Sequence, residues 1–475
     1  MDYQQTARRL FGYVSLLLCW GQLTAQDQAG IALSNFSGSH GFHWNPASAA
    51  SGPLRWDVGL FNAHAFAANN YAYFPQSSLS SLSDQTPDVA YYDNARYRGA
   101  VLTDLRGPSF MARIQQNHVI GLFTSVRTYS RVIGVDADLG YLDYENLPVG
   151  QVASIDPFEA ATMVWSEIGL HYSAILMDDR SGRWSFGVNL KYLQGAEGAF
   201  ADNGNGASIS KNQDGSLSVD NLELELAYAG NPGTGYEFGG SRGTGIGADF
   251  GLEFRSPDDR DGREPNRQGF RYGWKFGVAL VDVGWIRYRE EAQVYRFTGP
   301  FGSEQAIFDD AQFENVETLS EAVDIVAAEL NGQDSASAVQ TADRFSMGLP
   351  AGITLSADRH LGSDFYLAAM VVRPLPTPGR GISRTPVIAV VPRYERKFFE
   401  AAVPVSWVDD EDFRMGLSMR LGWLTVGTDD LLSAFVPGDL DGAEAYVGLK
   451  INDFSFAGNG NRRNRGTGCP AFNAP

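Results

Sequence analysis

The sequence predicts an all-β protein: a transmembrane antiparallel β-barrel of about 14 strands, with an N-terminal hatch-like segment and one amphipathic loop helix. Segments with apolar residues at every second position recur between residues 54 and 456. No apolar run approaches the roughly 20 residues that a membrane helix needs. The N-terminus has the pattern of a secretory signal. Together these observations predict an exported chain whose strands lie between an apolar medium and water.

The N-terminal pattern consists of Arg8 and Arg9, an apolar stretch over 10–20, and the small-residue sequence ending at Ala25. We expect residues 1–25 to be a signal peptide that is cleaved after Ala25. Cleavage would remove Cys19 and leave Cys469 as the only thiol, which excludes an intramolecular disulfide. The formal net charge of -19 argues against nucleic acid as a partner.

Residues 26–53 are rich in Gly, Ser, Ala and Asn. They contain the hatch candidates Trp44, Asn45, Pro46 and Ala47. Because Asn-Pro begins a turn, we expect a short periplasmic or hatch segment here, packed under a barrel mouth.

The strand pattern is clearest in 183–194, where Trp184 and the alternate residues after it are apolar and the residues between, such as Lys191, are polar. Further strands are expected at 164–176, 221–228, 245–255, 275–281 and 412–421. The apolar phase should face lipid and the polar phase the lumen. Glycines on the polar phase are expected where strands bend or where another segment packs closely inside the barrel.

The inward phase carries both signs of charge, so its residues either pair across the lumen and close it or leave a hydrated route. The lumen-lining candidates are Glu167, His171, Arg183, Lys191, Glu223, Glu225, Asp249, Glu253, Arg255, Arg414 and Arg420.

Connections are either short, as at 178–182, or long and polar, as at 75–108, 131–161, 195–220 and 255–270, which predicts periplasmic turns and external loops respectively. The connection at 318–330 differs because its apolar residues have helical spacing and a capping box precedes them. We expect this helix to pack on or into the barrel, and a sharper hypothesis makes it a docking site for a partner. The docking candidates are Leu319, Val323, Val326 and Leu330. Residues 457–475 form a polar tail.

Local signatures of zinc hydrolases, nucleotide enzymes, serine hydrolases and redox proteins are absent from the sequence, so we expect no enzyme and assign no catalytic, cofactor or metal residues. His40 and His43, and acidic loops at 258–262 and 439–444, are interpreted as turns. One alternative remains open, a barrel-embedded hydrolase in which Ser and an acid converge near His171.

Four segments resemble the DUF5723-type outer-membrane barrels of Bacteroidota, which are similar in layout to fatty-acid-transporter-like and PorV-type secretion barrels. They are Asn45-Pro46-Ala47, residues 276–286, residues 345–357 followed by 365–372, and residues 421–430. The resemblance implies an outer-membrane location and an N-terminal hatch at 26–53. It implies no specific activity.

The leading hypothesis is an outer-membrane barrel that acts as a conduit for a solute, possibly a hydrophobic ligand, or as a scaffold subunit of a protein-export or surface-assembly machine. Its partners would be membrane lipid and export or cell-surface machinery. A conduit requires a route past 26–53, whereas a scaffold predicts a plugged lumen. The alternatives are the barrel hydrolase and a secreted soluble β-protein, whose apolar faces would point inward.

Overall fold

The computed structural model describes residues 28–81, 88–94, 96–136, 148–150, 152–211, 213, 217–220, 223–230, 240–258, 272–298, 319–331, 337–376, 380–409 and 412–453. The predicted signal peptide and tail lie outside these residues. The helices are α2 (Ala29–Ala32), η1 (Gly38–His43), α3 (Ser48–Ser51), α6 (Leu319–Asn331) and α7 (Leu431–Phe435). The strands are β1 (Trp56–Asn69), β2 (Ala72–Ser77), β3 (Ala90–Tyr91), β4 (Arg96–Arg106), β5 (Ser109–Ile114), β6 (His118–Asp136), β7 (Val152–Ile155), β8 (Glu159–Asp179), β9 (Gly182–Asp202), β10 (Ala207–Lys211), β11 (Leu217–Asp220), β12 (Glu223–Ala229), β13 (Gly243–Pro257), β14 (Tyr272–Tyr288), β15 (Ala292–Thr298), β16 (Ser337–Ala342), β17 (Phe345–Gly348), β18 (Gly352–Gly362), β19 (Phe365–Pro374), β20 (Val387–Glu395), β21 (Phe399–Ala402), β22 (Val405–Val408), β23 (Asp412–Met415), β24 (Leu417–Leu421), β25 (Leu424–Thr428), β26 (Gly438–Leu440) and β27 (Gly442–Asn452).

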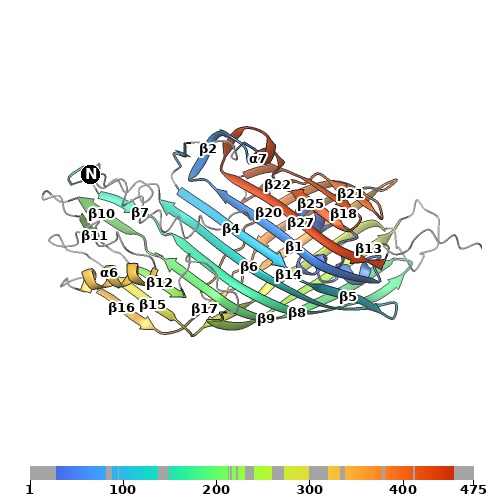
Figure 1. The fold of residues 1–475 in the computed structure, drawn as a ribbon, viewed down its shortest axis with the longest axis horizontal. Coiled ribbons are helices and arrows are strands. Elements are labelled where there is room, and N and C mark those ends of the chain that lie inside the picture. The colour runs from blue at the N-terminus through green and yellow to red at the C-terminus, as the bar shows by residue number, and fades with distance from the viewer. Residues whose placement is uncertain are drawn as a thin grey trace, which may run out of the picture.

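The main sheet closes on itself as an antiparallel barrel, because β1 pairs with β27 as well as with β4 and β5 (Figure 1). Around the wall the order continues through β6, β8, β9, β13, β14, β17 with β18, β19, β20, β21 with β22, β23 with β24, and β25. When interrupted strands are counted as one, the described residues form a closed 14-strand barrel. This confirms the predicted fold class.

The two ends of the barrel differ. Short turns at 115–117, 180–181, 363–364 and 422–423 lie at the end where β1 begins and β27 finishes, and long connections leave the other end. We call these the periplasmic and extracellular ends. Two predictions were wrong. The connection at 255–270 leaves the periplasmic end, because Arg255 pairs with Arg183 beside the short turn. The long connection expected at 75–108 contains the wall strand β4.

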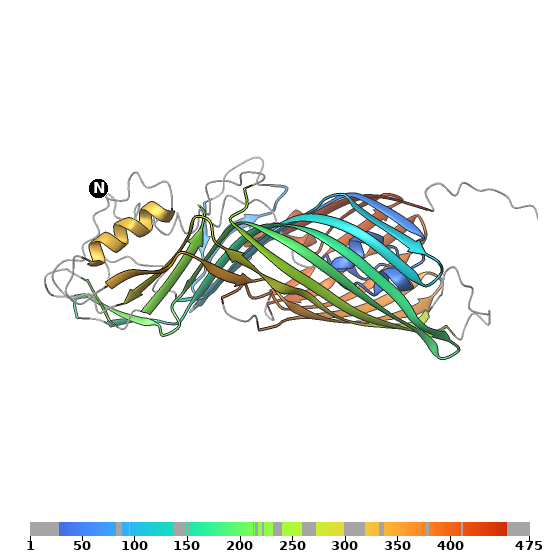
Figure 2. The same ribbon diagram turned by 90° about the horizontal axis from the view of Figure 1, so that it is seen from below.

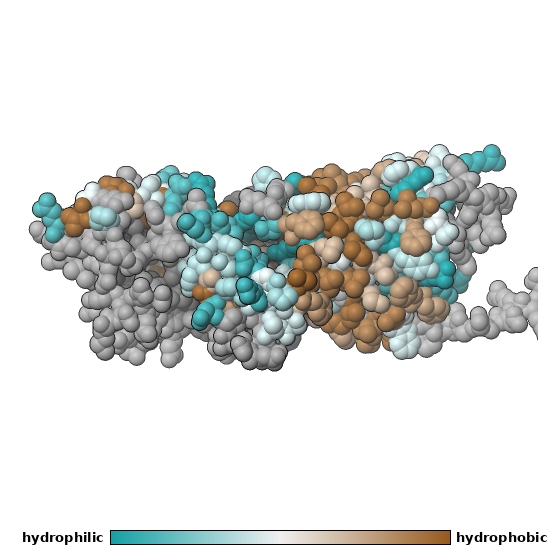
Figure 3. Space-filling view, turned by 90° about the horizontal axis from the view of Figure 1, so that it is seen from above, coloured by the Kyte–Doolittle hydropathy of each residue, from teal (hydrophilic) through white to brown (hydrophobic). Residues whose placement is uncertain are grey.

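The apolar phase faces outward, as predicted. Trp184 and Phe413 are 43% and 54% exposed, whereas Lys191 and Arg414 are 3% and 5% exposed. On β14 the outward apolar residues run from Trp274 to Trp285, eleven steps that span about 25 Å at ~3.3 Å per residue and ~45° tilt. Figure 3 shows a band of apolar surface across the face of the barrel that is in view. It fits a bilayer and excludes the soluble alternative, whose apolar faces would be buried.

Two details depart from the predicted strand pattern. The inner faces of β19 and of the first part of β20 are apolar, with Ala368, Met370 and Val391 buried in a cluster. The strand predicted at 412–421 is interrupted at Gly416, where a Cβ would lie 2.2 Å from the carbonyl oxygen of Thr428. The chain at 428–429 therefore leaves no room for a side chain at position 416.

The extracellular end carries an extension in which β12, β15 and β16 continue the sheet beyond β9 (Figure 2). The helix α6 packs on this extension through Val323 and Ala327, which contact Tyr228, Tyr295 and neighbouring residues. Smaller sheets of β7, β10 and β11, and of β2, β3 and β26, lie at the same end. Within the described chain, no helix is long and apolar enough to cross a membrane.

Candidate functional site in the plugged lumen

Residues 28–55, which we call the plug, lie inside the barrel (Figure 2). Their hatch candidates Trp44, Pro46 and Ala47 are buried, and Asn45 is half-buried. The Asn45 side-chain oxygen accepts a hydrogen bond from the Ala47 amide at 2.9 Å, which forms the expected turn. The turn brings main-chain atoms, rather than long side chains, against the wall.

Three wall glycines receive this turn. A Cβ at Gly187 would lie 2.3 Å from the carbonyl carbon of Pro46, and one at Gly251 would lie 2.1 Å from the side-chain oxygen of Asn45. Gly277 lies beside the same amide group. Glycine is needed at these positions because any side chain would overlap the plug. This is the close internal packing that the glycines on the polar phase predicted.

Cationic side chains of the wall hold the backbone of the plug. Arg113 of β5 donates to the carbonyl groups of Ala50, Ala49 and Gly52 at 2.8, 3.1 and 2.8 Å. Elsewhere, donors from three further strands bind plug carbonyls: Arg106 binds His40, Lys275 binds Leu33, and Lys450 binds Phe36 and Ser37. Main-chain carbonyl groups along the plug thus find hydrogen-bond donors on the wall.

Above the plug, three cations converge on Asp282 of β14. Arg127 donates to both carboxylate oxygens at 2.7 and 3.0 Å, Lys191 donates at 2.8 Å, and Arg384 donates at 3.1 Å. Lys191 also pairs with Asp249 at 2.8 Å. All five groups are buried. Oppositely charged residues therefore pair across the lumen and close it, one of the two outcomes that the inward charges allowed.

Arg384 belongs to residues 380–386, which fold inward between β19 and β20. The amide of Thr385 donates to the hydroxyl of Tyr129 at 2.9 Å, and Arg131 donates to the carbonyl of Ser383 at 3.2 Å. Ile382 is fully buried. We call this segment the inner loop, because it covers the Asp282 cluster from the extracellular side.

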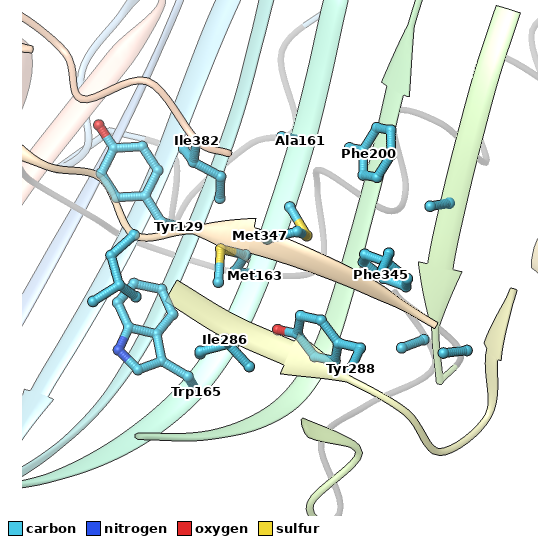
Figure 4. Close-up of a cluster of buried hydrophobic side chains, with 14 of the residues drawn as sticks. Tyr129, Ala161, Met163, Trp165, Phe200, Ile286, Tyr288, Phe345, Met347 and Ile382 are labelled. Carbon is cyan, nitrogen blue, oxygen red and sulfur yellow. The ribbon is translucent and has the colours of Figure 1, made fainter. Parts of the chain in front are cut away.

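An apolar cluster fills the lumen toward the extracellular end (Figure 4). It combines side chains from opposite sides of the wall with Ile382 of the inner loop. Its fully buried large members include Met163, Trp165, Leu193, Ile286, Tyr288 and Met347. The lumen therefore combines charged and apolar contacts around the plug, where Phe42 and Leu54 pack on wall residues such as Phe123, and it is mainly apolar above the Asp282 cluster.

The structure places the lumen-lining candidates in two groups. Nine are buried on the inner face of the barrel: Glu167, His171, Arg183, Lys191, Asp249, Glu253, Arg255, Arg414 and Arg420. Glu223 and Glu225 lie instead on β12 in the extracellular extension, where Glu223 is exposed and Glu225 half-buried. The alternating pattern predicts which face of the strand these two residues occupy, but it does not predict how far along the barrel axis they lie.

Several candidates pair with residues that the sequence did not single out. Arg420 pairs with Glu400 at 3.0 Å, whereas Arg255 pairs with another candidate, Glu253, at 2.7 Å. The network also includes Arg127, Asp282, Asp358, Arg384, Arg393 and Glu395. Asp282 was missed because it stands in the apolar run 278–283, where a single carboxylate was the available signal.

His171 sits in a hydrogen-bonded chain that bears on the hydrolase alternative. Its Nε2 lies 3.0 Å from the Ser173 hydroxyl and its Nδ1 lies 2.7 Å from the Asn189 side-chain oxygen. The ring is stacked on Phe42 of the plug at a centroid distance of 3.7 Å. Ser173 is fully buried, so in this state substrate cannot reach it. The described residues contain no group of three His, Cys, Asp or Glu side chains arranged to hold a metal ion.

Of the docking candidates on α6, Val323 is buried and Leu319 half-buried against the extension. Their apolar contacts are therefore made within the chain itself. The side chains of Val326 and Leu330 lie outside the described residues. The helix begins and ends within one residue of the range predicted from its capping box.

A family model described as "Family of unknown function (DUF5723)" matches residues 46–429. The chain belongs to this family. The match confirms the DUF5723 resemblance and begins within the Asn-Pro-Ala turn of the plug. A search of curated proteins finds no match.

Solved structures similar to this DUF5723 chain include the Pseudomonas putida toluene transporter TodX, with 10% identity, coverage of 91% of this chain and 98% of that chain, and a TM-score of 0.42. A Pseudomonas aeruginosa FadL homologue has 11% identity, coverage of 90% and 97%, and a TM-score of 0.40. The Ralstonia pickettii toluene transporter TbuX has 10% identity, coverage of 87% and 94%, and a TM-score of 0.38.

Proposed function

We propose that this outer-membrane barrel is a conduit for a small apolar solute and that the plug closes it. The apolar cluster in the extracellular half of the lumen carries the proposal. A water-filled pore is lined by polar groups, whereas a route through this closed cluster would be lined by the apolar surfaces of Trp165, Leu193 and Met347, which are now buried against one another. Such a surface suits a solute that leaves water to bind.

The mode of plug docking supports displacement during passage. The wall cations bind main-chain carbonyls of the plug, and those carbonyls can exchange the cations for water. Each such exchange has a small net free energy, about 1 kcal/mol for an ordinary hydrogen bond and up to ~3 kcal/mol with a charged donor. A plug held this way can leave without unfolding the barrel wall.

A disulfide lock tests the proposal. The hydroxyls of Ser39 in the plug and Ser109 in β5 are 2.9 Å apart, so cysteines there are well placed to form a disulfide. The double variant S39C/S109C, with Cys19 and Cys469 changed to serine, should take up the apolar dye N-phenyl-1-naphthylamine into whole cells only when reduced. The single variant S109C is the control and should be indifferent to oxidant. Equal uptake with the disulfide formed would rule out passage by plug displacement.

The extracellular extension favours a second candidate, a scaffold for an export or surface-assembly machine. Strands β12, β15 and β16 and helix α6 share an apolar core outside the barrel, and a simple conduit has no use for it. A scaffold should work with its lumen closed. The oxidised S39C/S109C barrel would then keep the same partners in native-membrane purification as the wild type, and cells would keep the surface proteins that depend on it.

A further inference from the structure

The barrel wall has a seam near its extracellular end. Among the described residues, β23 pairs only with β22, and residues 442–445 of β27 pair only with β1. The strand between them, β25, ends at Thr428 before it reaches these edges. A barrel in a bilayer cannot leave strand edges facing lipid without partners, so another element has to close this seam.

On the inside, Arg414 covers the seam. Its guanidinium carbon lies 4.8 Å from the ring centre of Phe66 on β1, and its Nη1 lies 3.7 Å from the Asp430 carboxylate. A Cβ at Gly442 would lie 3.0 Å from its Nη2. The side chain therefore reaches from β23 to the first residue of β27.

On the outside, the short helix α7 takes the place of the missing strand, in contact with both β23 and β27. Asp430 caps it by accepting a hydrogen bond from the Ser433 amide at 3.2 Å. Leu79 and Ser80 donate amide hydrogen bonds to its carbonyls at 3.0 and 3.2 Å. Figure 1 shows α7 beside β2 at this rim.

The outer surface of α7 is apolar and exposed. Phe435, Val436 and Leu432 are 67%, 52% and 38% exposed, and no residue of the helix is buried. Phe435 has the highest exposed fraction among the large apolar side chains in the described chain. In water this surface would be an unfavourable patch on an otherwise polar rim.

The exposed surface continues the lipid-facing band of the barrel. The next strand, β23, carries Phe413, whose ring lies 5.5 Å from that of Trp407 on β22. Both rings point outward and are 54% and 41% exposed. Aromatic rings at this height form the girdle that anchors a barrel at the membrane interface. Through its contact with β23, α7 extends this girdle.

We propose that α7 faces lipid and closes the seam between β23 and β27. Acyl chains of the outer leaflet then cover Leu432, Phe435 and Val436. The proposal does not depend on what the lumen carries. Its partner is the membrane itself, because the surface is continuous with an interface already occupied by lipid.

Depth-dependent quenching tests this placement. With Cys19 and Cys469 changed to serine, single cysteines at positions 435, 413 and 152 carry a bimane label in nanodiscs containing brominated lipid. Position 413 reports the lipid girdle, and position 152 is an exposed apolar residue of the extracellular strand β7. Quenching at 435 should resemble that at 413. Quenching as weak as at 152 would place α7 in water and overturn the proposal.

A stability measurement provides a second test. The triple variant L432S/F435S/V436S should melt at a lower temperature than the wild type in lipid nanodiscs, because apolar groups are removed from lipid. The control V149S/V152S changes two exposed apolar residues of the extracellular region and should melt as the wild type does. An unchanged melting temperature for the triple variant would contradict the lipid contact.

Discussion

Replacing Gly187 by alanine should loosen the plug without disturbing the barrel. The added methyl would lie 2.3 Å from the carbonyl carbon of Pro46 and 2.6 Å from the amide nitrogen of Ala47, both main-chain atoms. Overlap of this kind costs about 1–3 kcal/mol, which corresponds to a fall of about 5- to 150-fold in the docking equilibrium. Hydrogen exchange of residues 28–55 in detergent, followed by mass spectrometry, should speed up by that factor while exchange in β8 and β9 stays unchanged.

Gly247 offers a matched control on the same inner face. The three atoms nearest to a Cβ there belong to Leu349, Leu193 and Lys191, at 3.2, 3.6 and 3.6 Å, and none is a plug atom. Since alanine is about 0.5–1 kcal/mol more favourable than glycine inside a strand, G247A should be neutral or slightly stabilising. If G187A exchanged its plug amides as slowly as G247A does, the inference that the wall glycines exist to admit the plug would be wrong.

Three further predictions follow from the lumen contacts. R113A should weaken plug docking by about 3 kcal/mol, roughly 100-fold, because it removes charge-assisted hydrogen bonds to plug carbonyls; exchange of 48–52 should accelerate, and less so in R113K. D282N should lower the free energy of unfolding by about 3–5 kcal/mol, because it leaves buried cations unpaired, whereas D178N, at the half-exposed partner of Arg183, should cost under ~1 kcal/mol in guanidinium titrations. Ser173 should stay unlabelled by a fluorophosphonate in the folded wild type, and labelling that disappears in S173A would revive the hydrolase alternative.

The barrel fold was predictable because the same alternation of apolar and polar residues recurs along most of its strands. Residues such as Trp184 and Lys191 alternate, and a lipid exterior with a polar interior converts that alternation into a fixed orientation of each side chain. The exceptions have a physical reason. Ala368 and Met370 point inward although they are apolar, because β19 faces apolar neighbours inside the barrel rather than water.

The closed lumen was not predictable in the same way. The convergence on Asp282 depends on which strands face each other across the barrel, and that information is absent from the local sequence. Arg384 comes from a loop whose sequence suggests only a turn. Arg113 lies on a short strand, and it binds main-chain carbonyl groups of the plug, which carry no side-chain signal in the sequence. A carboxylate inside an apolar strand, as at Asp282, was the one local indication of an internal site.

In these contacts the plug supplies main-chain carbonyl groups and the wall supplies charged side chains. This explains why the plug sequence carries no recognisable motif of charged residues. Its Gly, Ser, Ala and Asn residues allow main-chain carbonyls to approach the wall, and the wall supplies the charge through Arg113, Lys275 and Lys450. The larger plug side chains include Trp44, which is buried, and Phe42, which covers His171. Because these cationic contacts are made to backbone, substitutions of small plug residues should matter less than substitutions of the wall cations, except at Ser34 and Ser51, whose hydroxyls donate to Glu400 and Glu253 of the wall. A segment built this way can be displaced and can dock again with the same partners, as a gate must.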